Sequence, residues 1–394
     1  MTSASAPIAG RFIEAHIIQA VPYANLNRDD TNSVKTVQFG GVNRTRVSSQ
    51  SWKRAMRLRL QKHLGEEALR TRRLAARIQR HLADERGWPE ELAARAGQHV
   101  VVASSVGGEA PKKEEGDIAW TTPAMVYVPD TAVAELCDLV EEHREGLEKA
   151  KDSKTLKQKD ALVPTQRIDD VLRSRNGVIN LFGRMLAQVG EAKVDGAVQV
   201  AHAFTTHSTD TEIDYFSAVD DVTDDWADTT GSAHMGHAEH SAGVLYRYVV
   251  LDLADLLENT GGDAKAARRL AAGFLEAALM SLPQAKKNST AAHTIPDLAH
   301  LTVRADRPVS YASAFEQPVR HGRDGGHTAP SIDALAAYAE AVGRLLSKDH
   351  ALFRAHASLS AKDITGLGKR VDSFEALTSG ALDAALASPA EGTA

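Results

Sequence analysis

The segment Gly40–Lys62, GGVNRTRVSSQSWKRAMRLRLQK, combines dense positive charge with a helical apolar pattern. Its basic residues, with no acidic residue among them, are Arg44, Arg46, Lys53, Arg54, Arg57, Arg59 and Lys62. The two glycines at its start predict a loop in the first half. In the second half, apolar residues at a spacing of four predict an amphipathic helix over 49–64, and they are Trp52, Met56, Leu60 and Leu64.

The sequence Ser48-Ser49-Gln50-Ser51 joins the two halves, and Ser48 or Ser49 is expected to cap the helix. Backbone N–H groups at a capped N-terminus carry partial positive charge and suit an anion. Basic residues precede this cap and recur one turn apart after it, so the surface suits a row of phosphates. The simpler alternative is a solvated basic helix. The absence of acids, with hydroxyl and amide donors at the helix entrance, favours the phosphate interpretation.

Charge is distributed unevenly along the 394 residues, although the net charge of −6 is not that of a basic protein. No Lys or Arg occurs between Lys193 and Arg247. That segment contains the carboxylates Asp210, Glu212, Asp214, Asp220, Asp221, Asp224, Asp225 and Asp228. Their density indicates a solvated or partner-facing surface rather than a magnesium site. Separate basic and acidic faces allow one to hold a polyanion and the other a basic neighbour, such as a second copy.

The single cysteine, Cys137, excludes an intrachain disulfide and fits a reducing compartment. The N-terminus has no apolar core of signal-peptide length, and no apolar run approaches the length of a membrane span. We therefore expect a cytoplasmic protein with no membrane partner.

Outside two insertions, the hydrophobic pattern predicts an α+β fold with the order βαββαβ, the ferredoxin-like or RRM-type arrangement. The expected elements are a strand at 12–21, a helix at 49–64, strands at 197–205 and 244–253, a helix at 264–282 and a strand at 298–304. Residues 65–175 form the first insertion, which is expected to be helical. Residues 206–240 form the second, acidic insertion. Helices at 331–347 and 373–387 are expected in a C-terminal extension.

Other chemistries have weaker support in the sequence. His234, His237 and His240 resemble a metal cluster, but their spacing does not converge on one helix face, and a polar hairpin is preferred. His16 and His63 suggest an acid–base pair of an RRM-type endoribonuclease, although no catalytic motif surrounds either. The chain has no P-loop, dinucleotide-binding glycine pattern or nucleophile elbow. We expect no catalytic residue, no metal and no cofactor.

Short sequence runs along the chain resemble the backbone subunit of the type I-E CRISPR Cascade complex, the CasC family of the RAMP superfamily. The runs are NLNRDD (25–30), FGG (39–41), RTRVSSQSWKRAMR (44–57), FGRM (182–185), KVDGA (193–197), AHAFTTH (201–207), DYFSAVDD (214–221), GSAHMG (231–236), YRY (246–248) and AFE (314–316). Because they occur in order from residue 25 to beyond 310, they cover nearly the whole chain. The region 66–170 matches the family only loosely, so no contacts are carried over to it.

The resemblance implies a division into an RRM-like palm, helical fingers and a thumb. The palm would comprise 1–64, 176–205 and, with the C-terminal extension, 241–394; the fingers would be 65–175 and the thumb 206–240. Palm and fingers would bind the backbone of a guide RNA, and the thumb would push a base out of the stack at regular intervals. Met185 and Met235 would lie beside that base. Without the resemblance, Met185 is expected in the core. Trp52 is expected to be primarily a core residue and only secondarily a platform on which a base could stack.

Combining the basic segment with the resemblance predicts one set of RNA-binding residues. It comprises Arg28, Lys35, Arg44, Arg46, Ser48, Ser49, Gln50, Lys53, Arg54, Arg57, Arg184, Met185, Met235, Lys286 and Lys287. For Arg28, a salt bridge with its two acidic neighbours is an equal alternative to a phosphate contact.

The expected function is a non-catalytic scaffold that oligomerises along CRISPR RNA and presents the guide for pairing with target DNA in antiviral defence. Its partners would be CRISPR RNA, target DNA through the guide, further copies of itself, the other Cascade subunits and, through the complex, a recruited helicase-nuclease. The alternatives are an RRM-type endoribonuclease that processes CRISPR RNA with His16 or His63, and a zinc-dependent hydrolase built on the histidines at 234–240.

Overall fold

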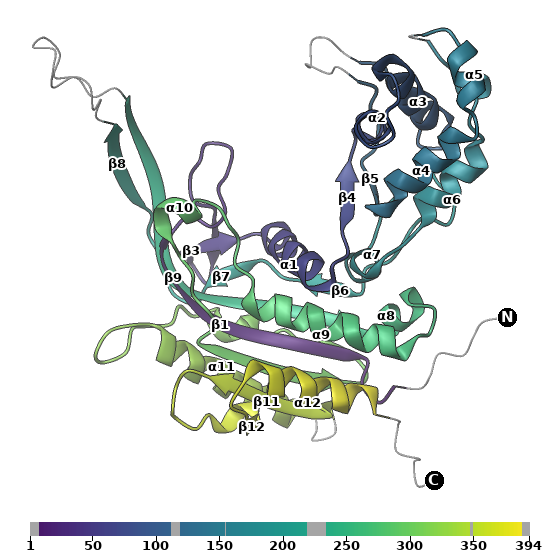
Figure 1. The fold of residues 1–394 in the computed structure, drawn as a ribbon. Helices are drawn as coiled ribbons and strands as arrows, with labels where there is room; N and C mark the ends of the chain where they lie inside the picture. The colour runs from purple at the N-terminus through teal and green to yellow at the C-terminus, as the bar shows by residue number, and fades with distance from the viewer. Residues whose placement is uncertain (1–7, 112–118, 154, 219–233, 347–349, 388–394) are drawn as a thin grey trace, which may run out of the picture. The chain divides into compact units, whose positions relative to one another are not determined.

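The computed structural model describes residues 8–111, 119–153, 155–218, 234–346 and 350–387, which form a mixed α+β fold (Figure 1). The chain divides into two compact units. The first unit comprises residues 1–59, 198–257 and 262–394, and the second comprises 60–197 and 258–261. Helix α1 (Ser49–Leu64) begins in the first unit and ends in the second.

The first unit is built on a large, mostly antiparallel sheet with the strand order β12-β11-β10-β1-β9-β7-β3-β2. Strands β6 and β8 also pair with β9. The bounds are β1 Phe12–Ala24, β2 Thr36–Phe39, β3 Val42–Val47, β6 Val198–Val200, β7 Ala203–Thr205, β8 Glu212–Ala218, β9 His234–Asp252, β10 Leu298–Arg304, β11 Phe353–Ser358 and β12 Lys369–Arg370. Strand β1 is central, and its first eight residues are buried on both faces.

Helices cover both faces of this sheet. Helices α9 (Ala264–Met280) and α12 (Phe374–Leu386) contact each other, and α1 lies on the same face, where Trp52 meets Arg247 of β9. The 3-10 helix η4 (Ala312–Phe315) and α11 (Thr328–Leu345) pack on the other face, in a cluster with Ile18 and Tyr246. Side chains alternate between the two faces along a strand, so neighbouring residues of β1 and β9 contribute to different layers. Three shorter helices complete the unit: α8 Leu253–Asn259, α10 Lys287–Thr290 and η6 Thr365–Leu367.

The strongest sequence patterns are confirmed. The helix at 49–64 and the strand at 298–304 have the predicted bounds, and the strand at 12–21, the helix at 264–282 and the strand at 244–253 correspond to β1, α9 and the second half of β9. The expected strand at 197–205 is interrupted, because Ala201 and His202 separate β6 from β7. Helices α11 and α12 confirm the two predicted C-terminal helices.

The predicted loop at the start of the basic segment is wrong, because only its two glycines form a turn. Gly40 and Gly41 have φ angles of 63° and 78°, which suit a tight hairpin turn, and they join β2 to β3. Strand β3 therefore contains Arg44 and Arg46. Basic residues at alternate positions give no apolar strand pattern, so this short strand, which pairs with the adjacent β2 and the distant β7, was not predicted.

The C-terminal extension also contributes strands that the sequence analysis did not predict. Strand β11 pairs antiparallel with β10, and β12 pairs parallel with β11, so the extension enlarges the sheet. The interrupted apolar pattern of β11, FRAHAS, gives little strand signal.

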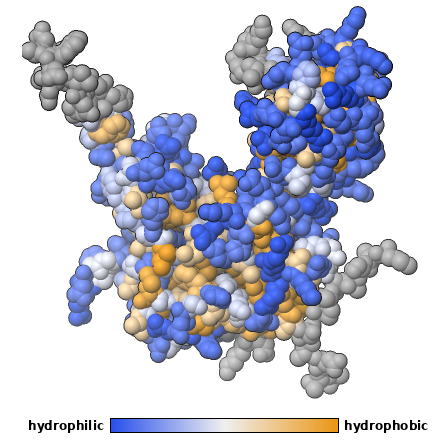
Figure 2. Space-filling view, viewed as in Figure 1, coloured by the Kyte–Doolittle hydropathy of each residue, from blue (hydrophilic) through white to orange (hydrophobic). Residues whose placement is uncertain are grey.

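The second unit is mainly helical around its own core. Its elements are β4 Ala68–Thr71, α2 Leu74–Asp84, α3 Glu90–Ala103, β5 Val126–Pro129, α4 Thr131–Glu141, α5 Arg144–Lys149, η2 Gln158–Asp160, α6 Thr165–Arg173 and α7 Gly177–Phe182. Ile78, Leu136 and Ile168 are fully buried in that core. Figure 2 shows that the visible surface of this unit is mostly hydrophilic.

Two features of the second unit differ from the expected helical insertion. Strands β4 and β5 form an antiparallel ribbon in a region predicted to be helical. The unit also extends to Ala197 instead of ending at 175. The reason is packing, because Val178, Ile179 and Val194 share a cluster with Ala68 and Tyr127 of the ribbon.

The acidic segment forms a hairpin in its described part. Strand β8 pairs antiparallel with the first part of β9, from Glu212 opposite His240 to Ala218 opposite His234. This confirms the hairpin that was preferred to a metal cluster at 234–240. Residues 219–233, which include five of the predicted acidic positions, lie outside the described residues.

Candidate nucleic-acid interface

Helix α1 separates its apolar and basic residues onto different faces. Trp52, Met56 and Leu60 are buried, with exposures of 1%, 0% and 0%, which confirms the prediction that Trp52 is a core residue. At about 100° per residue, Gln50, Arg54 and Arg57 lie on the outward face, whereas Lys53 lies at the edge of the buried stripe. Gln50 and Arg54 are exposed, and Lys53 and Arg57 are half-buried.

The start of α1 is capped as the sequence predicts. Ser48 Oγ accepts a hydrogen bond from the Ser51 N–H at 3.3 Å. The Ser48 N–H donates to Asn27 Oδ1 at 2.8 Å, which connects the cap to the loop that contains Arg28 and Lys35. The same loop contacts β3, since the Arg46 N–H donates to the Lys35 carbonyl at 2.8 Å. The structure thus brings Lys35, Arg46 and Ser48 together.

His202 also belongs to this group, and the sequence analysis missed it. Its Nδ1 lies 3.1 Å from the Ser49 N–H and 3.2 Å from Arg46 Nη1, and both of these groups are donors. Nδ1 is therefore the acceptor in both contacts. The side chain is exposed. Its position in the run AHAFTTH, between β6 and β7, was the available signal.

Two basic residues of α1 are held by contacts within the first unit. Lys53 Nζ donates to the Val198 carbonyl at 3.3 Å, and partial burial lowers the pKa of Lys53. Arg59 donates from Nε to both carboxylate oxygens of Glu276, at 2.9 and 3.0 Å. Arg59 therefore serves the contact between α1 and α9.

Arg28 is exposed on a loop that is organised by other residues. Its Nη1 donates to Asn32 Oδ1 at 2.9 Å, and within the described ranges it has no ion pair with either acidic neighbour. Asp29 instead accepts from the Thr31 hydroxyl at 2.8 Å, and this hydrogen bond lowers the pKa of Asp29. The salt-bridge alternative for Arg28 is therefore wrong.

The base of the β8–β9 hairpin anchors the same loop. Glu239 accepts from the Ser33 hydroxyl at 3.0 Å and from the Val34 N–H at 3.1 Å. Asn25 Nδ2 donates to the Glu239 carbonyl at 2.9 Å. The position of the loop therefore depends on the start of β9.

Lys286 and Lys287 lie in the segment between α9 and β10. Lys286 has a left-handed backbone with φ 53°, and its carbonyl accepts from the N–H groups of Ser289 and Thr290, both at 3.1 Å. Lys286 is half-buried and Lys287 is exposed. Lys286 also helps to lower the pKa of His240, which shows that this lysine lies near the hairpin base, although burial of the imidazole is the larger cause.

Arg44 and Arg184 were predicted to bind RNA, but both guanidinium groups are buried and used by the fold. Arg44 is 0% exposed and donates to the carbonyls of Phe39, Thr205, Phe315 and Glu316. Arg184 is 3% exposed and donates to the carbonyls of Tyr127, Arg173, Ser174 and Ala192. Burial lowers the pKa of Arg184 to about 10. Sequence alone does not separate such arginines from exposed ones.

Met185 and Met235 are strongly exposed, at 87% and 75%. The core interpretation of Met185 is therefore wrong, and each thioether is accessible to a partner. Ile213, Tyr215 and Phe216 of β8 add exposed apolar surface to the hairpin.

The histidines of the hairpin do not converge. His237 is exposed, whereas His240 is buried and stacks on Tyr23 with ring centroids 4.3 Å apart. Residues three apart on an extended strand point to opposite faces. The side chain of His234 lies outside the described part of the structure.

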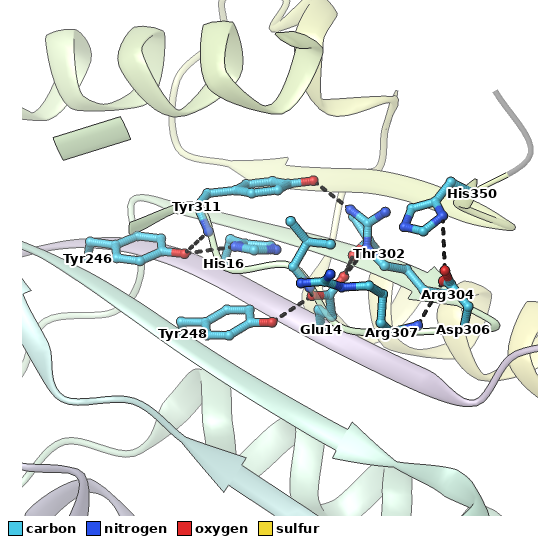
Figure 3. A network of polar contacts seen from close by, with 11 residues as sticks. Glu14, His16, Tyr246, Tyr248, Thr302, Arg304, Asp306, Arg307, Tyr311 and His350 are labelled. Atoms are coloured by element: carbon cyan, nitrogen blue, oxygen red, sulfur yellow. Dashed lines mark hydrogen bonds and ion pairs between the residues drawn. The ribbon is translucent and has the colours of Figure 1, made fainter. Parts of the chain in front are cut away.

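His16 lies inside a buried polar network on the α11 side of the sheet (Figure 3). Its ring stacks on Tyr311 with centroids 3.9 Å apart, and Nδ1 lies 2.9 Å from the Tyr246 hydroxyl. Burial lowers the pKa of His16 well below its usual value. Because the imidazole is 0% exposed, it cannot contact an RNA chain in this conformation, which disfavours His16 in the alternative endoribonuclease. His63 is exposed at the end of α1.

Glu14 accepts hydrogen bonds from four groups of this network. One carboxylate oxygen accepts from the Tyr248 hydroxyl at 2.6 Å and the Val309 N–H at 2.5 Å. The other accepts from the Thr302 hydroxyl at 2.7 Å and from Arg304 Nε. Every contact satisfies a buried polar group, as expected of a structural network.

Comparison with known proteins gives one family and close structural relatives. The profile of the family described as "CT1975-like protein" matches residues 13–379. A chain of a solved structure described as "CRISPR RNA-guided surveillance complex, pre-nicking" is 44% identical, with a TM-score of 0.87, and the match covers 95% of this chain and 99% of that chain. A second, described as "CRISPR RNA-guided surveillance complex", is 40% identical with a TM-score of 0.77, covering 95% and 100%. No curated protein sequence matches.

Proposed function

Because this chain belongs to the CT1975-like protein family, we propose that it is an RNA-binding subunit of a CRISPR RNA-guided surveillance complex. More specifically, we propose the backbone subunit of a type I-E Cascade, the CasC family. The observation that carries the RNA-binding role is the grouping of Lys35, Arg46 and the capped start of α1, which continues into the outward face of that helix.

The proposed contacts go to phosphate and ribose. A guide-holding subunit must accept any guide sequence, so base-edge contacts would be a disadvantage. Cationic, hydroxyl and amide donors on one helix face are suited to phosphate oxygens. Arg44 and Arg184 are left out because their donors are already bound. The proposed set is Arg28, Lys35, Arg46, Ser48, Ser49, Gln50, Lys53, Arg54, Arg57, Lys286 and Lys287, with His202 added.

The sheet of the first unit supports the proposed RRM-like palm. Four consecutive neighbours in its strand order are β10, β1, β9 and β7, all antiparallel, while α1 and α9 share one face. We propose that the β8–β9 hairpin belongs to the thumb of 206–240, and that Met185 and Met235 wedge beside a displaced base. Their exposure supports this role.

Assembly follows from the same proposal. Further copies would line up head to tail along CRISPR RNA, because heterologous contacts that do not close produce a helical filament. The other subunits would limit its length, target DNA would pair with the guide, and a helicase-nuclease would be recruited by the complex. In this role the subunit breaks no covalent bond.

Part of the proposal is a cytoplasmic location. In the parts of the chain that the structure describes, no helix combines the length and apolarity of a membrane span.

Incubation of the purified chain with CRISPR repeat RNA tests this function. The proposal predicts that the RNA is bound and stays intact, and that log K falls steeply with log salt. Cleavage that depends on His63 would favour the endoribonuclease instead. Stoichiometric zinc in the purified protein would favour a hydrolase.

A further inference from the structure

Arg247 is a buried arginine without an acidic partner. It lies on β9 with 2% exposure, and no carboxylate of the described residues pairs with it. Its guanidinium contacts three other elements. Nη1 donates to Gln19 Oε1 of β1 at 2.7 Å, Nη2 donates to the Ala278 carbonyl of α9, and Cζ lies 3.9 Å from the ring centroid of Trp52 on α1.

Packing alone does not explain an arginine at this position. Burying a charge without an opposite charge is costly, and apolar side chains often replace buried ionic groups without loss of stability. Consistent with this cost, burial lowers the pKa of Arg247 to about 9. Its Nε has no hydrogen-bond partner among the described residues.

Gln19 extends the contact from Arg247 to the lysine-containing segment 284–294. Its Nε2 donates to the Thr294 carbonyl at 2.9 Å and to Thr294 Oγ1 at 3.1 Å. Gln19 is 1% exposed, so water does not compete for these bonds. A continuous series of contacts therefore runs from Trp52 through Arg247 and Gln19 to Thr294.

This series joins two basic elements that are distant in sequence. At one end, Trp52 lies on α1, the helix that provides the outward basic face. At the other end, Thr294 terminates the segment that contains Lys286 and Lys287. Asp297 fixes the following residues to β1, because its Oδ2 accepts from the Ala20 N–H at 2.7 Å. Of these two contacts with β1, Gln19–Thr294 is nearer in the sequence to Lys286 and Lys287 than Ala20–Asp297 is.

We propose that Arg247 and Gln19 are positioning residues that hold α1 and segment 284–294 in register, so that their cations bind neighbouring phosphates of one RNA strand. This inference rests on the proposed RNA-binding function. Neither side chain touches RNA, since both are buried behind the elements that they align.

The test measures single-stranded RNA binding by the full-length chain over a range of salt concentrations. Each phosphate contact on a single strand contributes about 0.7 to the slope of log K against log salt. Arg247→Met keeps an unbranched side chain as far as the position of Nε but loses the guanidinium contacts with Gln19, Ala278 and Trp52. We expect its slope to fall by about 1.4, the contribution of two lysines. Lys286→Ala with Lys287→Ala should then add little to the Arg247→Met variant, although it weakens wild-type binding.

Two further variants separate positioning from stability. Gln19→Met breaks the link to Thr294 without removing the Arg247–Trp52 contact, and it should lower the slope equally even if Arg247→Met fails to fold. Arg184→Met removes another buried arginine bound to backbone carbonyls, and it should lower the melting temperature without changing the slope. Wild-type slopes in both Arg247→Met and Gln19→Met would overturn the inference. Salt-independent or absent RNA binding by the wild type would overturn the proposed function itself.

Discussion

Gly40 lies directly against the backbone of Glu316. A Cβ atom at Gly40 would be 1.6 Å from the Glu316 carbonyl oxygen, and the φ angle of Gly40 is 63°. The same carbonyl accepts from Arg44 Nη2, so the β2–β3 turn, the buried arginine and the end of η4 form one contact. The runs FGG and AFE, far apart in the sequence, meet here.

We predict that Gly40→Ala destabilises the first unit by more than about 2 kcal/mol, because it adds a clash to a left-handed backbone. Gly41→Ala is the matched control. Gly41 also has a positive φ, 78°, but no atom lies within 4 Å of its added Cβ. That substitution should cost only about 1–2 kcal/mol. Urea unfolding of both variants checks the difference, and equal losses would contradict the close contact.

Reversing charge on the outward face of α1 should weaken RNA binding without unfolding the chain. Arg54→Glu with Arg57→Glu replaces two cations that lie away from the buried Trp52 stripe. The melting temperature should stay near that of the wild type, and RNA affinity measured by fluorescence anisotropy should fall. Lys362→Glu with Lys369→Glu makes the same change in charge at exposed positions near the β11–β12 edge. Equal affinity in the two double variants would remove α1 from the interface.

The exposed methionines should matter for RNA geometry and hardly at all for stability. Met185→Ala and Met235→Ala remove side chains that are 87% and 75% exposed, so each should change the free energy of unfolding by less than about 0.5 kcal/mol. Met56→Ala, at a fully buried position, should cost about 2–5 kcal/mol. In the assembled complex, the Met185 and Met235 variants should weaken the regular nuclease-protection pattern. An unchanged pattern would argue against a wedge beside the displaced base.

The chain should lose stability as the pH falls below about 6.5, the usual histidine pKa. Burial lowers the pKa of His207 to about 4 and that of His300 to about 3, and it also lowers the pKa of His16. The unfolded chain therefore binds protons that the native chain does not bind, so stability is present above pH 6.5 and declines toward pH 4. Each group contributes up to about 1.4 kcal/mol per pH unit.

His300→Asn tests this origin of the pH dependence. In the wild type, His300 Nδ1–H donates to the Ala355 carbonyl at 2.9 Å, and an asparagine amide can replace that donor without titrating. The urea concentration at the midpoint of unfolding should change less between pH 7 and pH 5 in the variant than in the wild type. Replacement of the exposed His63 by Gln should leave the difference as in the wild type. A wild-type midpoint that does not change with pH would contradict the prediction.

The elements that sequence could predict are those with strong local patterns. Helix α1 follows from residues four apart, and β10 from the short run LAHLTVR, whose apolar and polar residues are all buried. Strand β3 was missed because its partners, β2 and β7, are short, and its basic residues resembled a loop. Element type follows from local period, whereas pairing depends on distant segments.

Side-chain environment was harder to predict than secondary structure. Arg44 and Arg184 are of a residue type typical of phosphate sites, but they donate inward to backbone carbonyls. Met185 is of a residue type typical of cores, but it is exposed. His202 completes the start of α1 only because β7 pairs with β3, which brings a distant histidine next to Ser49. Charge and hydropathy describe a residue, while burial depends on the tertiary contacts around it.

The central claim is most directly tested by co-expressing the chain with a CRISPR array and the other subunits, then measuring particle mass, absorbance ratio and nuclease protection. A large particle containing intact RNA, protected at regular intervals, is the predicted result. An RNA-free monomer under the same conditions would contradict the claim that this chain is an RNA-binding scaffold.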